Sequence, residues 1–110
     1  MEFPALIDTG SDKTVSYMQP FGNFLGVSAD QFEGEPDRLS GLVGESNAWA
    51  KHIDLWIGEH RLNVPIFWLL NKFDVHSNYP FILGRHIVFD YFDVVFCQQD
   101  KKVYFYPRKE

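Results

Sequence analysis

The sequence has few of the features that point to disulfides, nucleic acid or membranes. Cys97 is the only cysteine, which excludes an internal disulfide and suits a small buried side chain. Ten basic residues face 15 acidic ones, for a net charge of −5, so the positive surface that nucleic acid or anionic lipid requires is missing. No apolar run reaches the ~18 residues of a membrane span, and residues 1–4 do not resemble a signal peptide. The sequence therefore favours a soluble, cytoplasmic protein with no nucleic-acid or membrane partner.

Several catalytic motifs are also missing. No histidine lies in a metal-binding spacing such as H-E-x-x-H, and a lone cysteine cannot build a zinc knuckle. A G-x-S-x-G nucleophile turn and a glycine-rich phosphate loop are absent too. We therefore expect no metal and no cofactor, and solvated or hydrogen-bonded roles for the four histidines, His52, His60, His76 and His86.

The composition is that of one folded domain. Hydrophobic residues make up 45% of the 110 residues and aromatic residues 17%, which is well above the range of disordered chains. This length suffices for one core but not for two lobes. We therefore expect a single domain over residues 1–110.

Alternation of apolar and polar residues, the period of a half-buried strand, is clearest in the middle of the chain. It runs through residues 50–57 and again through 62–68, on either side of a turn at 58–60. The pattern predicts a long antiparallel hairpin, with Pro65 at an edge position or a bulge.

Shorter elements are expected on both sides of this hairpin. Apolar spacings of three and four over residues 17–27 predict a short helix closed by Gly26, and residues 86–90 suit a helical turn. Residues 28–39 read as an acidic loop. Strands are expected at 1–7, 11–16, 92–96 and 103–106. Together the elements predict an all-β fold, mainly strands with one or two short helices.

A carboxylate stands where the first strand ends. Leu6 and Ile7 suit a buried strand, and they run directly into Asp8-Thr9-Gly10-Ser11. Gly10 supplies the bare backbone that a sharp turn or a close ligand requires. Asp, Gly and Ser also cluster in ordinary turns, so the motif alone leaves a structural turn open.

A second apolar-glycine element, Phe81-Ile82-Leu83-Gly84, lies far downstream. Together the two elements resemble the aspartic peptidases in their single-lobe, retropepsin-like form. Residues 82–107 resemble the closing segment of a pepsin lobe, whereas the Gly84-Arg85 pair resembles the retroviral type. The resemblance implies a closed β-barrel of the acid-protease fold, with one lobe per chain.

The activity implied by this resemblance is endopeptidase hydrolysis of a polypeptide. Two carboxylates that share one proton activate a water molecule, and two such groups ~3 Å apart cannot both ionise. The chain holds no second Asp-Thr-Gly or Asp-Ser-Gly. The catalytic pair would therefore be Asp8 and its symmetry mate in a homodimer.

The resemblance also assigns roles to neighbouring residues. Thr9 would hydrogen-bond across the dimer, and Gly10 would let the backbone approach carboxylate and substrate. Arg85, next to Gly84, would pair with Asp12 to support the loop. Substrate contacts would come from Leu6, Asp12, Phe81 and Ile82, and from a glycine-bearing flap with Gly41, Leu42, Val43 and Gly44. Plain core packing remains open for Leu6 and Ile82, as does a plain β-turn for the flap.

Two features keep other functions open. Only seven residues precede Asp8, whereas the resembling family carries a further hairpin there, so we expect either a missing segment or another segment over the open edge. A shared fold does not guarantee activity. The alternatives are a non-catalytic peptide-binding or dimerisation module on the same fold, and a small β-barrel ligand-binding protein in which Asp8 is structural.

Overall fold

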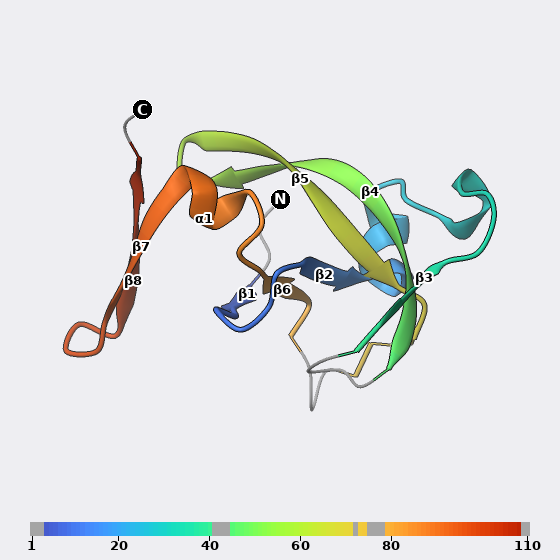
Figure 1. The fold of residues 1–110 in the computed structure, drawn as a ribbon, viewed down its shortest axis with the longest axis horizontal. Coiled ribbons are helices and arrows are strands. Elements are labelled where there is room, and N and C mark those ends of the chain that lie inside the picture. Colours follow the sequence, from blue (N-terminus) through green and yellow to red (C-terminus); the bar gives the residue numbers. More distant parts are fainter. Residues whose placement is uncertain (1–3, 41–44, 72, 75–78, 109–110) are drawn as a thin grey trace.

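The computed structural model describes residues 4–40, 45–71, 73–74 and 79–108. Within these ranges the strands form a six-stranded sheet in the order β1-β6-β2-β5-β4-β3 and a separate pair, β7-β8 (Figure 1). Helical segments are short, so the expected all-β class is confirmed. No helix in the described ranges is long and apolar enough to span a membrane.

The predicted central hairpin is confirmed as β4 (Ser46–Ile57) and β5 (His60–Leu69). Along β5 every second side chain from Leu62 to Trp68 is buried, whereas the alternate positions are partly or fully exposed. β5 pairs with β2 only from Ile66 onward, so Pro65 lies where this side of β5 has no β2 neighbour. Proline has no backbone N–H, and at this position its absence costs the sheet no hydrogen bond to β2.

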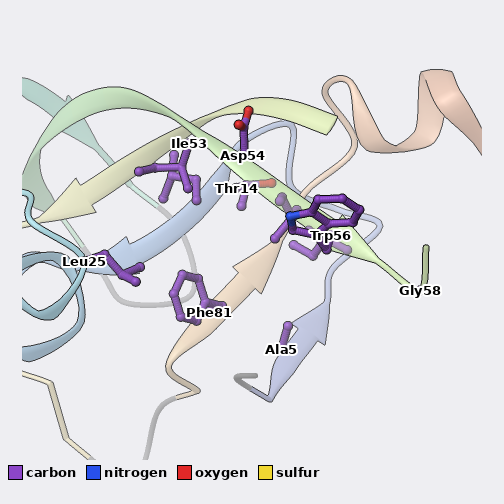
Figure 2. A pocket seen from close by; sticks show the side chains of 11 residues that line it. Ala5, Thr14, Leu25, Ile53, Asp54, Trp56, Gly58 and Phe81 are labelled. Carbon is purple, nitrogen blue, oxygen red and sulfur yellow. The ribbon is translucent and has the colours of Figure 1, made fainter. Parts of the chain in front are cut away.

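The sheet is curled, and three shorter strands continue it beyond β5 (Figure 1). β2 (Thr14–Tyr17) runs parallel to β5 and antiparallel to β6 (Phe81–Leu83), and β6 runs parallel to β1 (Ala5–Ile7). The outer strands are β1 and β3 (Asp37–Leu39), so the described sheet is an open half-barrel. Its open side holds an apolar cleft of about 610 Å³ (Figure 2).

Two groups of buried side chains make up most of the core. One surrounds Trp68 and contains Met18, Val27, Ile66 and Phe81. The other surrounds Phe92 and contains Leu62, Val64, Leu83 and Val88. Full burial of such a side chain contributes roughly 1.5–3 kcal/mol, so these groups supply much of the free energy that holds the sheet in its curl.

The helix expected over residues 17–27 is shorter than the apolar spacing suggested. Tyr17 belongs to β2, and the helical segment η1 (Met18–Gly22) is interrupted by Gln19, which has extended backbone angles. Tyr17 is 1% exposed, because it packs in the core as part of the strand and cannot also turn into a helix. η1 ends at Gly22, before the expected end, and Gly26 lies in the following turn with a φ of +83°, which favours glycine.

The segment expected as an acidic loop contains the short helical turn η2 (Ala29–Gln31) and β3. α1 (Val88–Tyr91) matches the predicted helical turn. It leads into the expected hairpin of β7 (Phe92–Cys97) and β8 (Lys102–Pro107), which stands off the end of the six-stranded sheet (Figure 1). The base of this hairpin packs on the core through Val94 and Phe105.

Candidate active site

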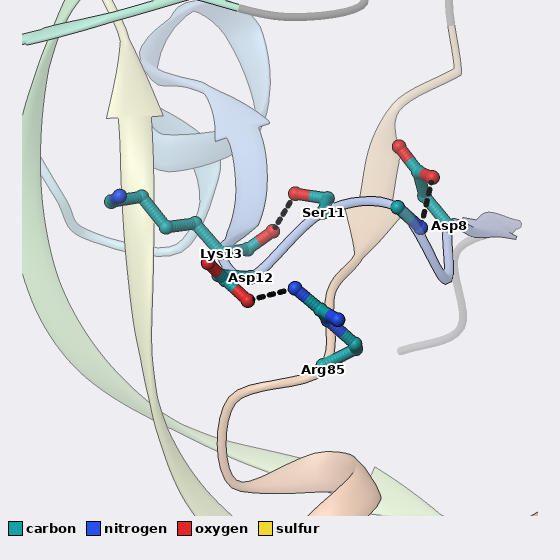
Figure 3. A network of polar contacts seen from close by, with 6 residues as sticks. Asp8, Ser11, Asp12, Lys13 and Arg85 are labelled. Carbon is teal, nitrogen blue, oxygen red and sulfur yellow. Dashed lines mark hydrogen bonds and ion pairs between the residues drawn. The ribbon is translucent and has the colours of Figure 1, made fainter.

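Asp8 lies directly after β1, at the start of a tight turn (Figure 3). Its backbone N–H donates to the carbonyl of Leu83 at 3.0 Å, which extends the pairing of β1 with β6 by one residue. The N–H of Gly10 donates to Asp8 Oδ1 at 3.0 Å, and the N–H of Ser11 donates to the Asp8 carbonyl at 3.2 Å. The turn therefore fixes both the main chain and the carboxylate of Asp8.

The segment after the turn is joined to the segment after β6 by further hydrogen bonds. The N–H groups of Arg85 and His86 donate to the carbonyls of Ser11 and Asp12, each at 2.9 Å. In the same region the N–H of Gly84 donates to the buried hydroxyl of Thr14 at 3.1 Å. Two segments far apart in the sequence thus brace each other through backbone groups, which restricts the motion of the Asp8 turn.

Gly84 makes this close approach possible. A Cβ atom added at Gly84 would lie 2.2 Å from the carbonyl oxygen of Lys13, and the neighbouring backbone atoms of Lys13 are nearly as close. Backbone cannot withdraw as a flexible side chain can. Any residue other than glycine would therefore push the two segments apart.

The guanidinium of Arg85 contacts the carboxylate of Asp12 in an ion pair (Figure 3). The Asp12 side chain is 74% exposed and the Arg85 side chain 49%, so water screens the pair. An exposed pair of this kind contributes roughly 0–1 kcal/mol. The position matches the pair implied by the resemblance, but the backbone hydrogen bonds hold these segments together far more strongly.

The turn is open to solvent on its outer side. Asp8 is half-buried, while Thr9 and Gly10 are exposed. A carboxylate in this setting can reach a substrate or a second chain. Among the described residues no group of three or more His, Cys, Asp and Glu side chains gathers as a metal site.

The expected substrate-contacting residues do not share one face of the β1-β6 pair. Leu6 lies beside Ile82, and Ala5 lies beside Phe81, so the side chains of Phe81 and Ile82 point to opposite faces. Phe81 lines the apolar cleft. The expected flap residues Gly41, Leu42, Val43 and Gly44 lie outside the described residues, between β3 and β4, whose ends pair at Leu39 and Ser46.

Sequence reasoning missed the two buried polar residues of β2. Thr14 accepts the hydrogen bond from Gly84, and Ser16 Oγ donates to the Pro80 carbonyl at 2.7 Å. Both side chains are at most 2% exposed. Polar residues at alternate positions of a buried strand could have indicated these bonds, because a buried hydroxyl requires a hydrogen-bond partner.

The pKa of Tyr17, the last residue of β2, departs from its ordinary value. Burial raises the pKa of Tyr17, and the Asp74 carboxylate raises it further. The hydroxyl has no hydrogen-bond partner among the described residues. The raised pKa keeps the Tyr17 phenol neutral at pH 7, and the side chain packs in the core.

Comparison of the chain with protein-family models, curated proteins and solved structures gives no match. The chemistry of the site must therefore be argued from its own residues.

Proposed function

We propose that the protein is an aspartic endopeptidase of the retropepsin-like type that acts as a homodimer. The observation that carries this proposal is the Asp8 turn, whose carboxylate accepts a hydrogen bond from the Gly10 amide. The turn is braced by the residues that follow β6. A rigid, solvent-accessible carboxylate on a sheet scaffold is the arrangement that acid catalysis on a peptide bond requires.

The reaction needs two carboxylates that share a proton. The ionised carboxylate takes a proton from water as the water oxygen attacks the peptide carbonyl, and the protonated carboxylate donates its proton to the carbonyl oxygen. The tetrahedral diol then returns a proton through the carboxylates to the amide nitrogen, and the C–N bond breaks to give an acid and an amine. The pair ends with one proton, as it began.

A second copy of the chain would supply the second Asp8, because this motif occurs once in the sequence. The exposed Thr9 is available for a contact between the two turns. The β7-β8 hairpin offers apolar surface for the same assembly, since Val95 and Tyr106 lie on one face of it and are 45% and 53% exposed. We assign substrate contact to the half-buried Leu6 next to the turn, because its register partner Ile82 is only 6% exposed and belongs to the core.

The test is a peptide-library digest with the wild type, Asp8→Asn and the control Asp37→Asn, at an exposed carboxylate of β3. Asp8→Asn should lower cleavage by about 10⁴-fold or more, because the pair loses the group that carries its charge. Asp37→Asn should cut at a rate close to that of the wild type. Cleavage that survives in Asp8→Asn would exclude the proposed mechanism.

The assembly is tested on the same samples by dilution. Specific activity should fall as the protein is diluted through the dissociation constant of the dimer, while sedimentation velocity records the loss of dimer. Full specific activity in a strictly monomeric sample would exclude a shared catalytic pair.

A non-catalytic peptide-binding module is the second candidate. The apolar cleft on the open side of the sheet favours it, because this cleft lies away from Asp8 and still offers surface to a peptide. Saturable peptide binding without cleavage in any library would support this alternative.

A further inference from the structure

The cleft on the open side of the half-barrel is built mainly from apolar side chains of several strands (Figure 2). β6 and β1 contribute Phe81, Leu83 and Ala5, and β4 contributes its last part, including Ile53 and Trp56. Its volume of about 610 Å³ is large enough for a ligand of several residues. The lining is completed by Thr14, Leu25, Asp54, Leu55, Gly58 and Ile66.

Two strands that border the cleft have open edges within the described part of the chain. β1 pairs with β6 on one side only. β4 pairs with β3 only from Ser46 to Ala48, so its remaining residues, as far as Ile57, pair with β5 alone. Open edges present unpaired N–H and C=O groups, which accept a further strand readily.

The apolar side chains around the cleft are incompletely covered. Ile53 and Leu55 are half-buried, although they lie on the inner face of a curled sheet. Trp56 is 62% exposed and Leu25 37% exposed. Each would gain stabilisation from an occupant at roughly 25 cal/mol per Å² of apolar surface covered.

This cleft is distinct from the Asp8 turn. Ala5 and Phe81 are register partners and face the cleft, whereas Leu6 and Ile82 lie on the opposite face of the same strand pair. An occupant of the cleft would therefore leave the proposed substrate face free.

We propose that the cleft receives an extended polypeptide segment of a partner protein, which adds as a strand and continues the open sheet. The stretch of β4 along the cleft, which starts at Ile53 and ends with the strand at Ile57, matches a strand of about five or six residues. Because side chains alternate along a strand, the segment carries apolar residues at every second position.

Charge further defines the segment. Asp54 lies at the border of the cleft, where its exposed carboxylate accepts a hydrogen bond from Asn63 at 3.1 Å, Glu59 is exposed in the turn that follows β4, and the whole chain has a net charge of −5. A strand flanked by lysine or arginine is attracted to this border, and an acidic one is repelled. The partner segment is therefore apolar at alternate positions and basic at its ends.

The experiment measures binding of a synthetic peptide in which Val and Thr alternate between terminal lysines. Isothermal titration calorimetry is done on the Asp8→Asn protein, so that cleavage cannot remove the probe. We expect saturable binding, and a loss of about tenfold or more when the backbone amides of the peptide are N-methylated, because methylation removes the donors for strand pairing. Equal affinity for the methylated peptide, or no saturable heat, overturns the proposal.

Two variants locate the binding. Ala5→Arg fills the border of the cleft from an exposed position and should weaken binding about tenfold or more, whereas Ala29→Arg, at an exposed alanine outside the cleft, should leave it within about twofold. Peptide addition should also shift the fluorescence of the wild type but not of Trp56→Phe. Unchanged binding in Ala5→Arg would place the peptide elsewhere and overturn the proposal.

A second copy of the chain is the other occupant that the test can reveal. If the protein self-associates in sedimentation velocity and only Ala5→Arg makes it monomeric, the cleft binds a second copy of the chain and the partner assignment is wrong. Since the calorimetry uses Asp8→Asn, its outcome does not depend on whether the protein is a peptidase.

Discussion

The turn after β1 and the cleft on the open side of the sheet differ in how far their polar and apolar groups are satisfied. At the turn, which we call the braced end, residues 8–14 and 83–86 are joined by backbone hydrogen bonds and by the Thr14 hydroxyl, and Gly84 lets the two segments touch. On the cleft side, β1 and most of β4 keep open edges among the described residues, and apolar side chains stay half-covered.

The comparison indicates that the Asp8 turn is the rigid region and that the cleft is the region able to bind a partner. Satisfied backbone groups resist local opening, so the Asp8 turn holds its shape without a ligand. Unpaired edges and uncovered apolar surface gain free energy only when something binds. Changes at the first region should therefore cost stability, while changes at the second should alter binding.

Gly84→Ala should have the largest effect on the braced end. The new Cβ would meet the Lys13 backbone at 2.2 Å, so we expect a loss of about 3 kcal/mol or more in the free energy of unfolding. Urea denaturation measures it. The control is Gly34→Ala, where no atom lies within 4 Å of the added Cβ and the φ of +76° alone should cost about 1–2 kcal/mol. Similar losses in the two variants would show that the close approach is unimportant.

Thr14→Val should come next, since it keeps the shape of the side chain and removes the acceptor of the Gly84 N–H. A buried donor without a partner costs about 1–3 kcal/mol. Thermal and urea unfolding should both show the loss, and hydrogen exchange at the Gly84 amide should accelerate. The exposed Thr9→Val is the control and should change the stability by less than about 0.5 kcal/mol. An unchanged exchange rate at Gly84 would contradict the role of Thr14.

Much of the braced end and of the sheet could be predicted from local patterns. The alternation in β4 and β5 is long enough to define a hairpin, and Leu6 to Gly10 has the signature of a strand that enters a turn. The bond between Gly84 and Thr14 joins residues 70 positions apart, and no local pattern encodes it. The apolar spacing around Tyr17 predicted a helix, whereas in the structure Tyr17 is buried as the last residue of β2.

The cleft could not be predicted for a different reason. Alternation shows that Ile53 and Leu55 share a face, and the structure agrees. Whether another element covers that face depends on how far the sheet closes. That depends on the pairing of β1, β2 and β6, which comes from distant parts of the sequence.

Tyr17→Phe tests how much the buried Tyr17 hydroxyl, rather than the packing of its ring, affects the stability. The hydroxyl is buried and unpaired among the described residues, so its removal at pH 7 should leave the stability unchanged or raise it by up to about 1 kcal/mol. Because the folded protein raises the pKa of Tyr17, the stability tied to the neutral phenol is full below pH ~10 and declines as the pH rises beyond it. The variant lacks this alkaline decline.

Urea titrations at pH 7 and above pH 10 test this expectation. The advantage of Tyr17→Phe over the wild type should grow with pH, because only the wild type carries the buried phenol. A gap between Tyr17→Phe and the wild type that stays constant across the alkaline range would contradict the assignment.

Arg85→Ala should have the smallest effect, although Arg85 stands in the most visible side-chain contact of the braced end. The partner Asp12 is 74% exposed, so its carboxylate stays hydrated when the guanidinium is removed, and the loss in unfolding free energy should be under about 1 kcal/mol. Added salt should shrink even this difference, because it screens exposed charges. The Arg85 N–H still donates to Ser11 in the variant, so the backbone brace persists.

A double-mutant cycle with Asp12→Ala isolates the pair. A coupling energy above about 2 kcal/mol would mean that the ion pair, rather than the backbone hydrogen bonds and Gly84, holds the Asp8 turn in place.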